Sequence, residues 1–231
     1  MYGVMVNSLA VIAGGAVGLF LRGGIAQRFS QIIEHALALC VLLIGLVGAL
    51  KADDIMLVIV CLVLGSIAGE ALRIEDGLTW LGTKAQQKFA KGDNTFAQGF
   101  IASTLLFCVG AMAVVGSLEA GLLGKADTLL AKSALDGVSS IIFASSLGAG
   151  VMLSSVSLLI YQGTIALAAG LVAPLLPPEV IGEMSVVGSM LIVGLALNML
   201  GATKERIKVG NMLPAMLLPP IYMQIMGMLT K

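Results

Sequence analysis

Charge is scarce in this sequence, and its scarcity excludes a water-soluble globular protein. Only 11% of the residues are Asp, Glu, Lys or Arg, whereas 58% are hydrophobic and the mean hydropathy is +1.05. A chain with so few charged side chains cannot cover a folded surface in water, so the composition predicts a polytopic membrane protein whose partner is the lipid bilayer. The net charge is zero and basic residues are scattered, so nucleic acid is not an expected partner.

Histidine and cysteine are also rare, and this limits the chemistry open to the chain. His35 is the only histidine, and Cys40, Cys61 and Cys108 lie in apolar segments without CxxC spacing. These patterns support neither a disulfide nor a metal site, and no paired catalytic acids stand out. The sequence has no G-x-x-x-x-G-K-[ST] motif, so any transport would depend on a gradient or on another protein. We therefore predict no enzyme activity, no cofactor and no metal.

Long apolar runs are abundant and predict an all-α bundle of transmembrane helices. A helix needs about 20 apolar residues to cross the hydrocarbon core. Runs near this length lie at residues 4–21, 36–50, 55–72, 98–116, 138–175, 185–200 and 208–229. The run 138–175 is too long for one untilted helix, and we expect two helices with a break at the serines of 154–157. Seven and eight spans are both open, and residues 1–231 form a single integral membrane domain.

The basic residues orient these helices. With eight spans and an external N-terminus, the inner loops hold Arg22, Arg28, Arg73, Lys84, Lys88, Lys91, Lys204, Arg206 and Lys208. The outer segments hold only Lys51, Lys125, Lys132 and Lys231. Because inner loops carry the excess of Lys and Arg, this distribution favours both termini outside. Two inner segments, 22–36 and 77–91, have apolar residues on one helical face and predict helices that lie on the membrane surface.

Two weak internal similarities stand out. The segments "GGAVGLFLR" (14–22) and "GSIAGEALR" (65–73) share the pattern G-x-x-x-G-x-x-L-R, whose glycines we interpret as helix-packing positions. The segments "LIGLVGAL" (43–50) and "IVGLALNM" (192–199) are similar to each other and run in opposite directions in the eight-span topology. This is the pattern of an inverted repeat, with halves near 1–90 and 98–231, and such repeats are typical of secondary transporters.

The stretch "KSALDGVSSIIFASSLGAGV" (132–151) carries the clearest concentration of polar residues. At 100° per residue, one helical face collects Asp136, Ser139, Ser140, Ser146, Gly150, Ser154 and Ser157. Two interpretations are open. Asp136 is either the N-cap of a helix that begins there, with the serines as packing groups, or the charged group of a polar path. The Gly137 that follows argues against a helix that begins before Asp136 and pairs it with Lys132.

Polar residues and prolines elsewhere favour a cavity. Asn7 and the segment 161–164 interrupt apolar runs, Asn198 lies near the end of another, and the last run holds Asn211 with three prolines. Prolines break a helix and are tolerated in a membrane where the irregular backbone is buried or lines water. We therefore predict a broken last helix and a substrate-binding cavity that is shared by Asp136, Ser139, Ser140, Asn198 and Asn211.

The elements "KSALDG", "YQGTIALAAG", "GLALNMLG" and "GNMLPAMLLPP" resemble the prokaryotic membrane family called domain of unknown function 554, over nearly the whole chain. The resemblance implies a multi-pass protein of the bacterial cytoplasmic membrane, with no established substrate. Two functions are open. The first is a secondary transporter or channel-like carrier for a small polar solute or ion. The second is a non-transporting membrane scaffold or assembly subunit, and in either case a homo-oligomer is a further expected partner.

Overall fold

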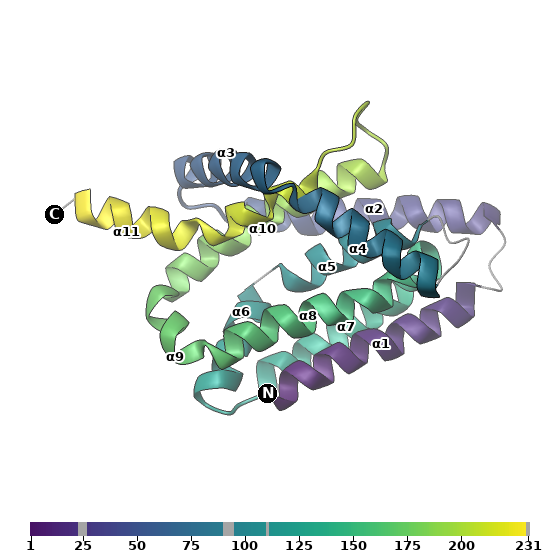
Figure 1. The fold of residues 1–231 in the computed structure, drawn as a ribbon, viewed down its shortest axis with the longest axis horizontal. Coiled ribbons are helices and arrows are strands. Elements are labelled where there is room, and N and C mark those ends of the chain that lie inside the picture. Colours follow the sequence, from purple (N-terminus) through teal and green to yellow (C-terminus); the bar gives the residue numbers. More distant parts are fainter. Residues whose placement is uncertain (23–26, 90–94, 110, 230–231) are drawn as a thin grey trace. The chain divides into compact units, whose positions relative to one another are not determined.

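The computed structural model describes residues 1–22, 27–89, 95–109 and 111–229, and these residues form helices without a β-strand (Figure 1). The α-helices are α1 (Tyr2–Arg22), α2 (Gln27–Ala49), α3 (Ile55–Leu72), α4 (Ile74–Phe89), α5 (Phe96–Cys108), α6 (Ala111–Leu122), α7 (Asp127–Leu147), α8 (Gly150–Leu167), α9 (Ala169–Val172), α10 (Pro178–Met199) and α11 (Pro219–Leu229). Two segments are 3₁₀ helices, η1 (Ala173–Leu175) and η2 (Val209–Leu217). The all-α prediction is confirmed.

Several helices are long and apolar enough to cross a membrane. Four of those described qualify alone, namely α1, α3, α8 and α10. A fifth span results if α5 and α6 are taken together, although this pair is bent by 62° at its break. The prediction of a helical membrane protein is therefore supported, with four to five helices of the described residues that qualify as spans where seven or eight were predicted.

The break within residues 138–175 lies earlier than predicted. Helix α7 ends at Leu147 and α8 begins at Gly150, so the serines of 154–157 lie inside α8 and the predicted position was wrong. Gly148 ends α7 with a φ of 79°, a conformation that glycine adopts readily. Ser154 and Ser155 leave their helix intact because each hydroxyl donates a hydrogen bond to a carbonyl three residues earlier.

Other boundaries also differ from the prediction. The run 98–116 is divided between α5 and α6, and the last run begins as the 3₁₀ helix η2 before α11 starts at Pro219. Because proline lacks an N–H group, it is suited to the first turn of a helix and disruptive within one. The boundary expected at residue 36 is absent, since α2 continues from Gln27 to Ala49. Helix α4 covers residues 77–89 of the predicted surface helix, and residues 90 and 91 lie outside the described part.

The chain is divided into two compact units that are interleaved in sequence. The first unit contains residues 1–37, 78–108 and 112–170, and the second contains 38–77, 109–111 and 171–231. Each unit takes segments from both of the repeat halves that the sequence suggested.

In the first unit, the glycines of α1 allow close packing against α7. A Cβ atom on Gly14 would collide with the carbonyl of Gly137, and one on Gly18 would collide with that of Ile141. Near the start of α1, Gly3 lies against Leu129. These contacts advance in the same direction along both helices, so α1 and α7 are parallel. Small residues spaced four apart thus let two backbones meet.

Helix α8 completes this packing in the opposite direction. Gly15 of α1 lies against Met152, near the start of α8, whereas Met1 lies near Gly163. Helices α1 and α8 are therefore antiparallel, and the chain reverses between α7 and α8. Helix α5 also packs on α8, where Gly150 lies against the Phe96 carbonyl.

In the second unit, the matching glycines of α3 pack against η2. Gly65 lies against Ala215 and Gly69 against the Asn211 carbonyl, so these two helices are antiparallel. The glycines of α2 make a similar contact with α10. Gly45 lies against Val193 and Ser189, and Gly48 against Ser189, so this pair is antiparallel as well. The interpretation of the glycines as packing positions is confirmed in both units.

Candidate functional site

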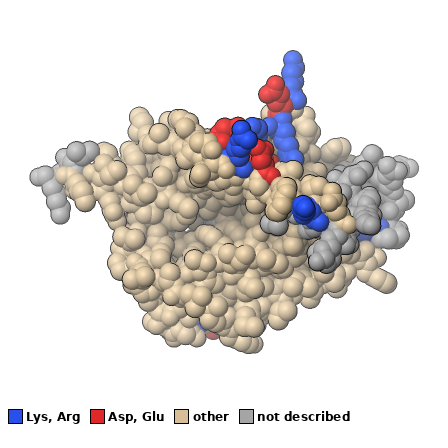
Figure 2. Space-filling model, in the orientation of Figure 1, with Lys and Arg blue, Asp and Glu red and all other residues tan. Residues whose placement is uncertain are grey.

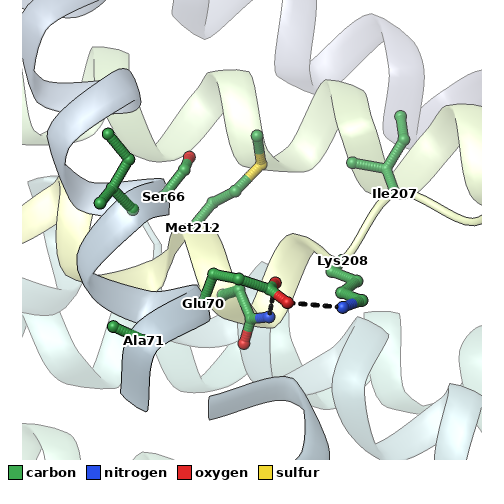
Figure 3. Close-up of a pocket in the computed structure, with 8 residues that line it drawn as sticks. Ser66, Glu70, Ala71, Ile207, Lys208 and Met212 are labelled. Carbon is green, nitrogen blue, oxygen red and sulfur yellow. Dashed lines mark hydrogen bonds and ion pairs between the residues drawn. The ribbon is translucent and has the colours of Figure 1, made fainter. Parts of the chain in front are cut away.

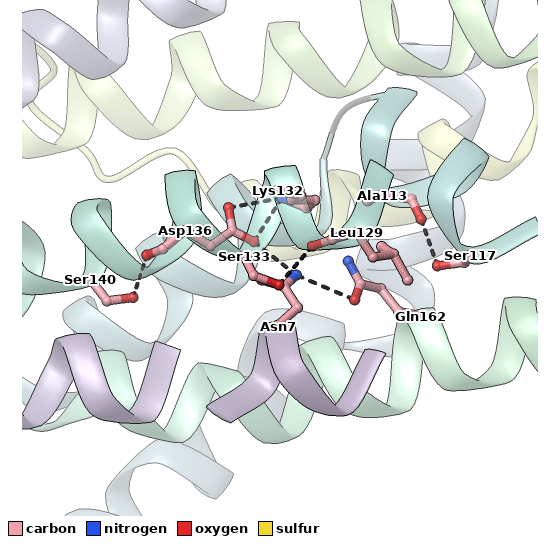
Figure 4. A network of polar contacts seen from close by, with 9 residues as sticks. All are labelled: Asn7, Ala113, Ser117, Leu129, Lys132, Ser133, Asp136, Ser140 and Gln162. Carbon is pink, nitrogen blue, oxygen red and sulfur yellow. Dashed lines mark hydrogen bonds and ion pairs between the residues drawn. The ribbon is translucent and has the colours of Figure 1, made fainter. Parts of the chain in front are cut away.

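Asp136 lies in the middle of α7, where it forms a buried ion pair. Helix α7 begins at Asp127, nine residues earlier, so the interpretation of Asp136 as an N-cap was wrong. Gly137 lies within α7 and does not prevent the helix from starting before Asp136, so that expectation was also wrong. The Lys132 Nζ atom is 2.9 Å from Asp136 Oδ1 and 2.8 Å from Oδ2. Both side chains are only 8% exposed, and Figure 4 shows the ammonium group facing the carboxylate.

Two amide side chains extend this pair into a three-helix polar cluster. Asn7 of α1 donates from Nδ2 to Asp136 Oδ2 at 3.0 Å and to Gln162 Oε1 of α8 at 3.3 Å (Figure 4). Asn7 and Gln162 are both 0% exposed. We call these four residues, Asn7, Lys132, Asp136 and Gln162, the buried polar cluster.

Two polar atoms of the buried polar cluster have no hydrogen-bond partner among the described residues. They are Asn7 Oδ1 and Gln162 Nε2. A buried polar atom without a partner costs about 1–3 kcal/mol. One acceptor and one donor beside an ion pair are therefore groups that a ligand or a water molecule would satisfy.

The serines around Asp136 are mostly bonded to their own helix. Ser140 donates to the Asp136 carbonyl at 2.7 Å, and Ser133 donates to the Leu129 carbonyl at 2.6 Å (Figure 4). Ser139, half-buried, lies on the same helix. Since their hydroxyl protons are used within α7, Ser133 and Ser140 offer acceptor lone pairs more readily than donors.

The two predicted asparagines belong to the second unit, where they hold local structure. Asn198 donates from Nδ2 to the Ile207 carbonyl at 2.7 Å and accepts from the Ile207 N–H at 2.8 Å, which closes the segment between them. Asn211 accepts from the Glu75 N–H and donates to Glu70 Oε2, both at 2.6 Å. Asp136, Ser139 and Ser140 thus lie in the first unit, and a cavity shared with Asn198 and Asn211 stays a prediction.

A pocket of about 490 Å³ lies beside Asn211 in the second unit (Figure 3). It is lined by Ser66, Ile67, Glu70, Ala71, Ile207, Lys208, Asn211 and Met212. At its polar edge, Lys208 Nζ is 2.8 Å from Glu70 Oε1, and the two side chains are 56% and 58% exposed. The hydrogen bond to Glu70 raises the pKa of the Lys208 amino group. The remaining walls are chiefly apolar, and the pocket is open.

Two segments that reach the polar edge of this pocket, 70–76 and 204–208, are rich in exposed charged residues. Exposed members are Glu70, Arg73, Asp76, Lys204, Glu205, Arg206 and Lys208. Figure 2 shows a group of red and blue side chains near the top of the view, while most of the rest of the visible face is uncharged. Such a division is typical of a protein whose apolar surface faces lipid and whose charges lie at the edge of the membrane.

Sequence reasoning wrongly argued against the pairing of Lys132 with Asp136 and missed the pairing of Lys208 with Glu70. Lysine four residues before aspartate is the spacing that brings two side chains together on a helix, and it was the signal available for the first pair. Asn7 and Gln162 were visible only as polar interruptions of apolar runs. Among the described residues, no group of three or more His, Cys, Asp or Glu side chains is arranged to hold a metal ion.

The sequence is similar to those of known proteins. The sequence profile of the family described as "Protein of unknown function (DUF554)" matches residues 2–224. The chain is 33% identical to the uncharacterized protein YqgA of Escherichia coli, over 94% of this chain and 93% of that protein. It is 31% identical to the uncharacterized membrane protein YdfK of Bacillus subtilis, over 96% of this chain and 95% of the relative. No solved structure matches the chain.

Proposed function

We propose that this chain, which belongs to the DUF554 family of proteins of unknown function, is a secondary transporter or channel-like carrier for a small polar solute or ion in the bacterial cytoplasmic membrane. The observation that carries the proposal is the buried polar cluster on α1, α7 and α8. An ionisable side chain within a transmembrane bundle is costly, and such residues usually mark the path of a solute, an ion or a proton.

The cluster is poorly explained as a packing device. A buried ion pair is weak evidence for stability, because removing two charges from water offsets much of their attraction. Here the neighbouring amides also leave Asn7 Oδ1 and Gln162 Nε2 without partners in the described structure. An apolar contact between these helices would avoid both costs. A binding role explains why polar groups occupy this position.

The direction of each helix pair supports the eight-span topology. That topology requires α1 parallel to α7, α8 antiparallel to α1, and α2 antiparallel to α10. It also requires α3 antiparallel to η2. The glycine contacts within the two units agree with all four requirements. Counting residues 35–49 of α2, α7 and the η2–α11 segment as spans, alongside α1, α3, α8, α10 and the α5–α6 pair, brings the total to eight.

Broken helices are a second feature that a transporter would use. The α5–α6 pair bends by 62°, and the last span changes from the 3₁₀ helix η2 to α11 at Leu218. Discontinuous helices expose backbone N–H and C=O groups, which bind solutes and ions in many transporters. An inverted repeat that relates 43–50 to 192–199 remains part of this proposal. The contact between these two antiparallel helices is compatible with it.

The function is tested by flux into proteoliposomes. Purified protein is reconstituted with a trapped pH-sensitive dye, and proton flux is measured in parallel with uptake of radioactive sodium, rubidium and a panel of small polar solutes. We expect flux of at least one of these above that of protein-free liposomes, and its loss in Asp136→Asn. Asp127→Asn, at the exposed start of the same helix, is the matched control. Absence of any flux, together with a partner protein that copurifies stably from the native membrane, would favour the scaffold instead.

The topology is tested by cysteine labelling. In a variant with Cys40, Cys61 and Cys108 replaced, single cysteines are placed at Lys84 and Lys51, both exposed. A membrane-impermeant thiol reagent added to intact cells should label position 51 and spare position 84. Labelling of position 84 from outside would reverse the proposed orientation.

A further inference from the structure

The buried polar cluster is better suited to a proton than to a metal cation. Lys132 Nζ lies within hydrogen-bond distance of both Asp136 carboxylate oxygens, so an ammonium group already occupies the place that a bound cation would take. Hard metal ions need about six oxygen ligands. Around Asp136, Oδ2 also accepts from Asn7, and Gln162 Oε1 accepts from the same amide. The described oxygens therefore do not form a cage for a metal.

The surroundings of Asp136 contain few other charges. On its own helix the titratable neighbour is Lys132, and Cys108 at the end of α5 is near enough for the charges of Lys132 and Asp136 to act on its thiol. Helices α1 and α8 present the uncharged Asn7 and Gln162, and the Tyr161 hydroxyl of α8 lies in the electrostatic range of Cys108. The charge balance of this interior thus depends on one carboxylate and one ammonium group.

We propose that Asp136 is the proton-binding group of the carrier and that Lys132 is the counter-ion its protonation releases, so that the coupling or transported ion is H⁺. This inference rests on the proposed transport function. In the loading step, a hydronium ion gives a proton to an Asp136 carboxylate oxygen and becomes water. An O–H bond forms, the ion pair is lost, and Lys132 stays an ammonium ion. Release reverses these steps.

The exposed start of α7 lies close enough for the released Lys132 ammonium group to reach water. An unpaired charge is unfavourable in the protein interior, whereas a lysine can extend its charged end toward water. Lys132 lies five residues after Asp127, the exposed first residue of α7, which is about 7.5 Å along the helix. In the ion pair its ammonium group lies against Asp136, one turn farther from that end, so once released it is free to turn back toward the exposed start of the helix. Protonation at Asp136 is thereby linked to a movement of charge along α7.

Infrared difference spectroscopy of the purified protein tests the proton-binding step without knowledge of the solute. Between mildly alkaline and mildly acidic pH, we expect a protonated-carboxyl C=O band that is absent from Asp136→Asn and retained in Asp127→Asn. The double variant Lys132→Gln/Asp136→Asn, whose cluster stays neutral, should also lack the band. This double variant takes the place of Asp136→Asn in the experiment if the single variant does not fold.

Proteoliposome flux separates this inference from the proposed function. We expect proton flux that falls to the level of protein-free liposomes in Asp136→Asn. Asp136-dependent sodium or rubidium flux without the infrared band would overturn the proton assignment and leave the transport function standing. A band together with proton flux that is unchanged in Asp136→Asn would also overturn it. Absence of both the band and every flux would defeat the two proposals together.

Discussion

The two units build the same three chemical groups into very different surroundings. In the first, Asn7 donates to Asp136, which pairs with Lys132 at 2.8 Å. In the second, Asn211 donates to Glu70, which pairs with Lys208 at 2.8 Å. Each set lies at a contact made by a G-x-x-x-G helix, α1 or α3. The first pair is 8% exposed on both side chains, whereas the second is 56% and 58% exposed.

This difference in burial determines what each pair contributes. In a buried pair, loss of one partner leaves a charge that neither water nor protein compensates. In an exposed pair, water solvates whichever charge remains. We therefore expect the stability and the transport activity of the protein to depend strongly on both residues of the Lys132–Asp136 pair. The Lys208–Glu70 pair should contribute only weakly to stability, as a contact between α3 and the segment before η2.

The largest effect is expected at Lys132. Lys132→Met should lower the free energy of unfolding by about 3–5 kcal/mol, because it leaves the Asp136 carboxylate buried without its counter-ion. The measurement is denaturation in mixed detergent micelles, followed by circular dichroism.

A double variant tests whether that loss comes from the unpaired charge. Lys132→Met/Asp136→Leu removes both charges, and its free energy of unfolding should lie within about 1 kcal/mol of the original protein. The same variant should have no flux. A double variant as unstable as Lys132→Met would show that the site depends on packing of the lysine stem, and not on the pair.

The glycine contacts should show an intermediate effect that is shared by the two units. Gly14→Ala and Gly69→Ala each place a methyl group against backbone atoms of the facing helix. We expect a loss of about 1–3 kcal/mol for each in the same denaturation assay. Gly182→Ala in α10 is the control, since its added Cβ meets no atom within 4 Å. Equal stability of all three variants would contradict the close packing of both G-x-x-x-G helices.

The smallest effect is expected at the exposed pair. Lys208→Met should lower the free energy of unfolding by less than about 1 kcal/mol, because water solvates the Glu70 carboxylate that remains. Added salt should shrink even this difference, since exposed charges are screened. A loss as large as that of Lys132→Met would remove the distinction between the two pairs.

The sequence predicted the helical class and several elements closely. Residues 55–72 were expected as one span and form α3 with the same limits, and 4–21 lies within α1. These segments were predictable because a continuous apolar run without proline has one stable form in lipid, a hydrogen-bonded helix. Breaks were harder to place. The 154–157 serines resembled a break, yet the hydroxyls of Ser154 and Ser155 bond within the helix, and Gly148 makes the turn instead.

What the sequence determined by itself was a membrane-embedded helical chain with Asp136 as a residue of interest, since composition and hydropathy depend on no partner. Only the tertiary structure decided which side chains meet Asp136. Lys132 pairs with Asp136 because α7 begins nine residues before Asp136, so both residues lie on one helix. Asn7 and Gln162 join it because glycines let α1 approach α7 and α8 closely, across 129 and 155 residues of sequence. Contacts between segments so far apart depend on how helix surfaces fit together, and no local pattern encodes that fit.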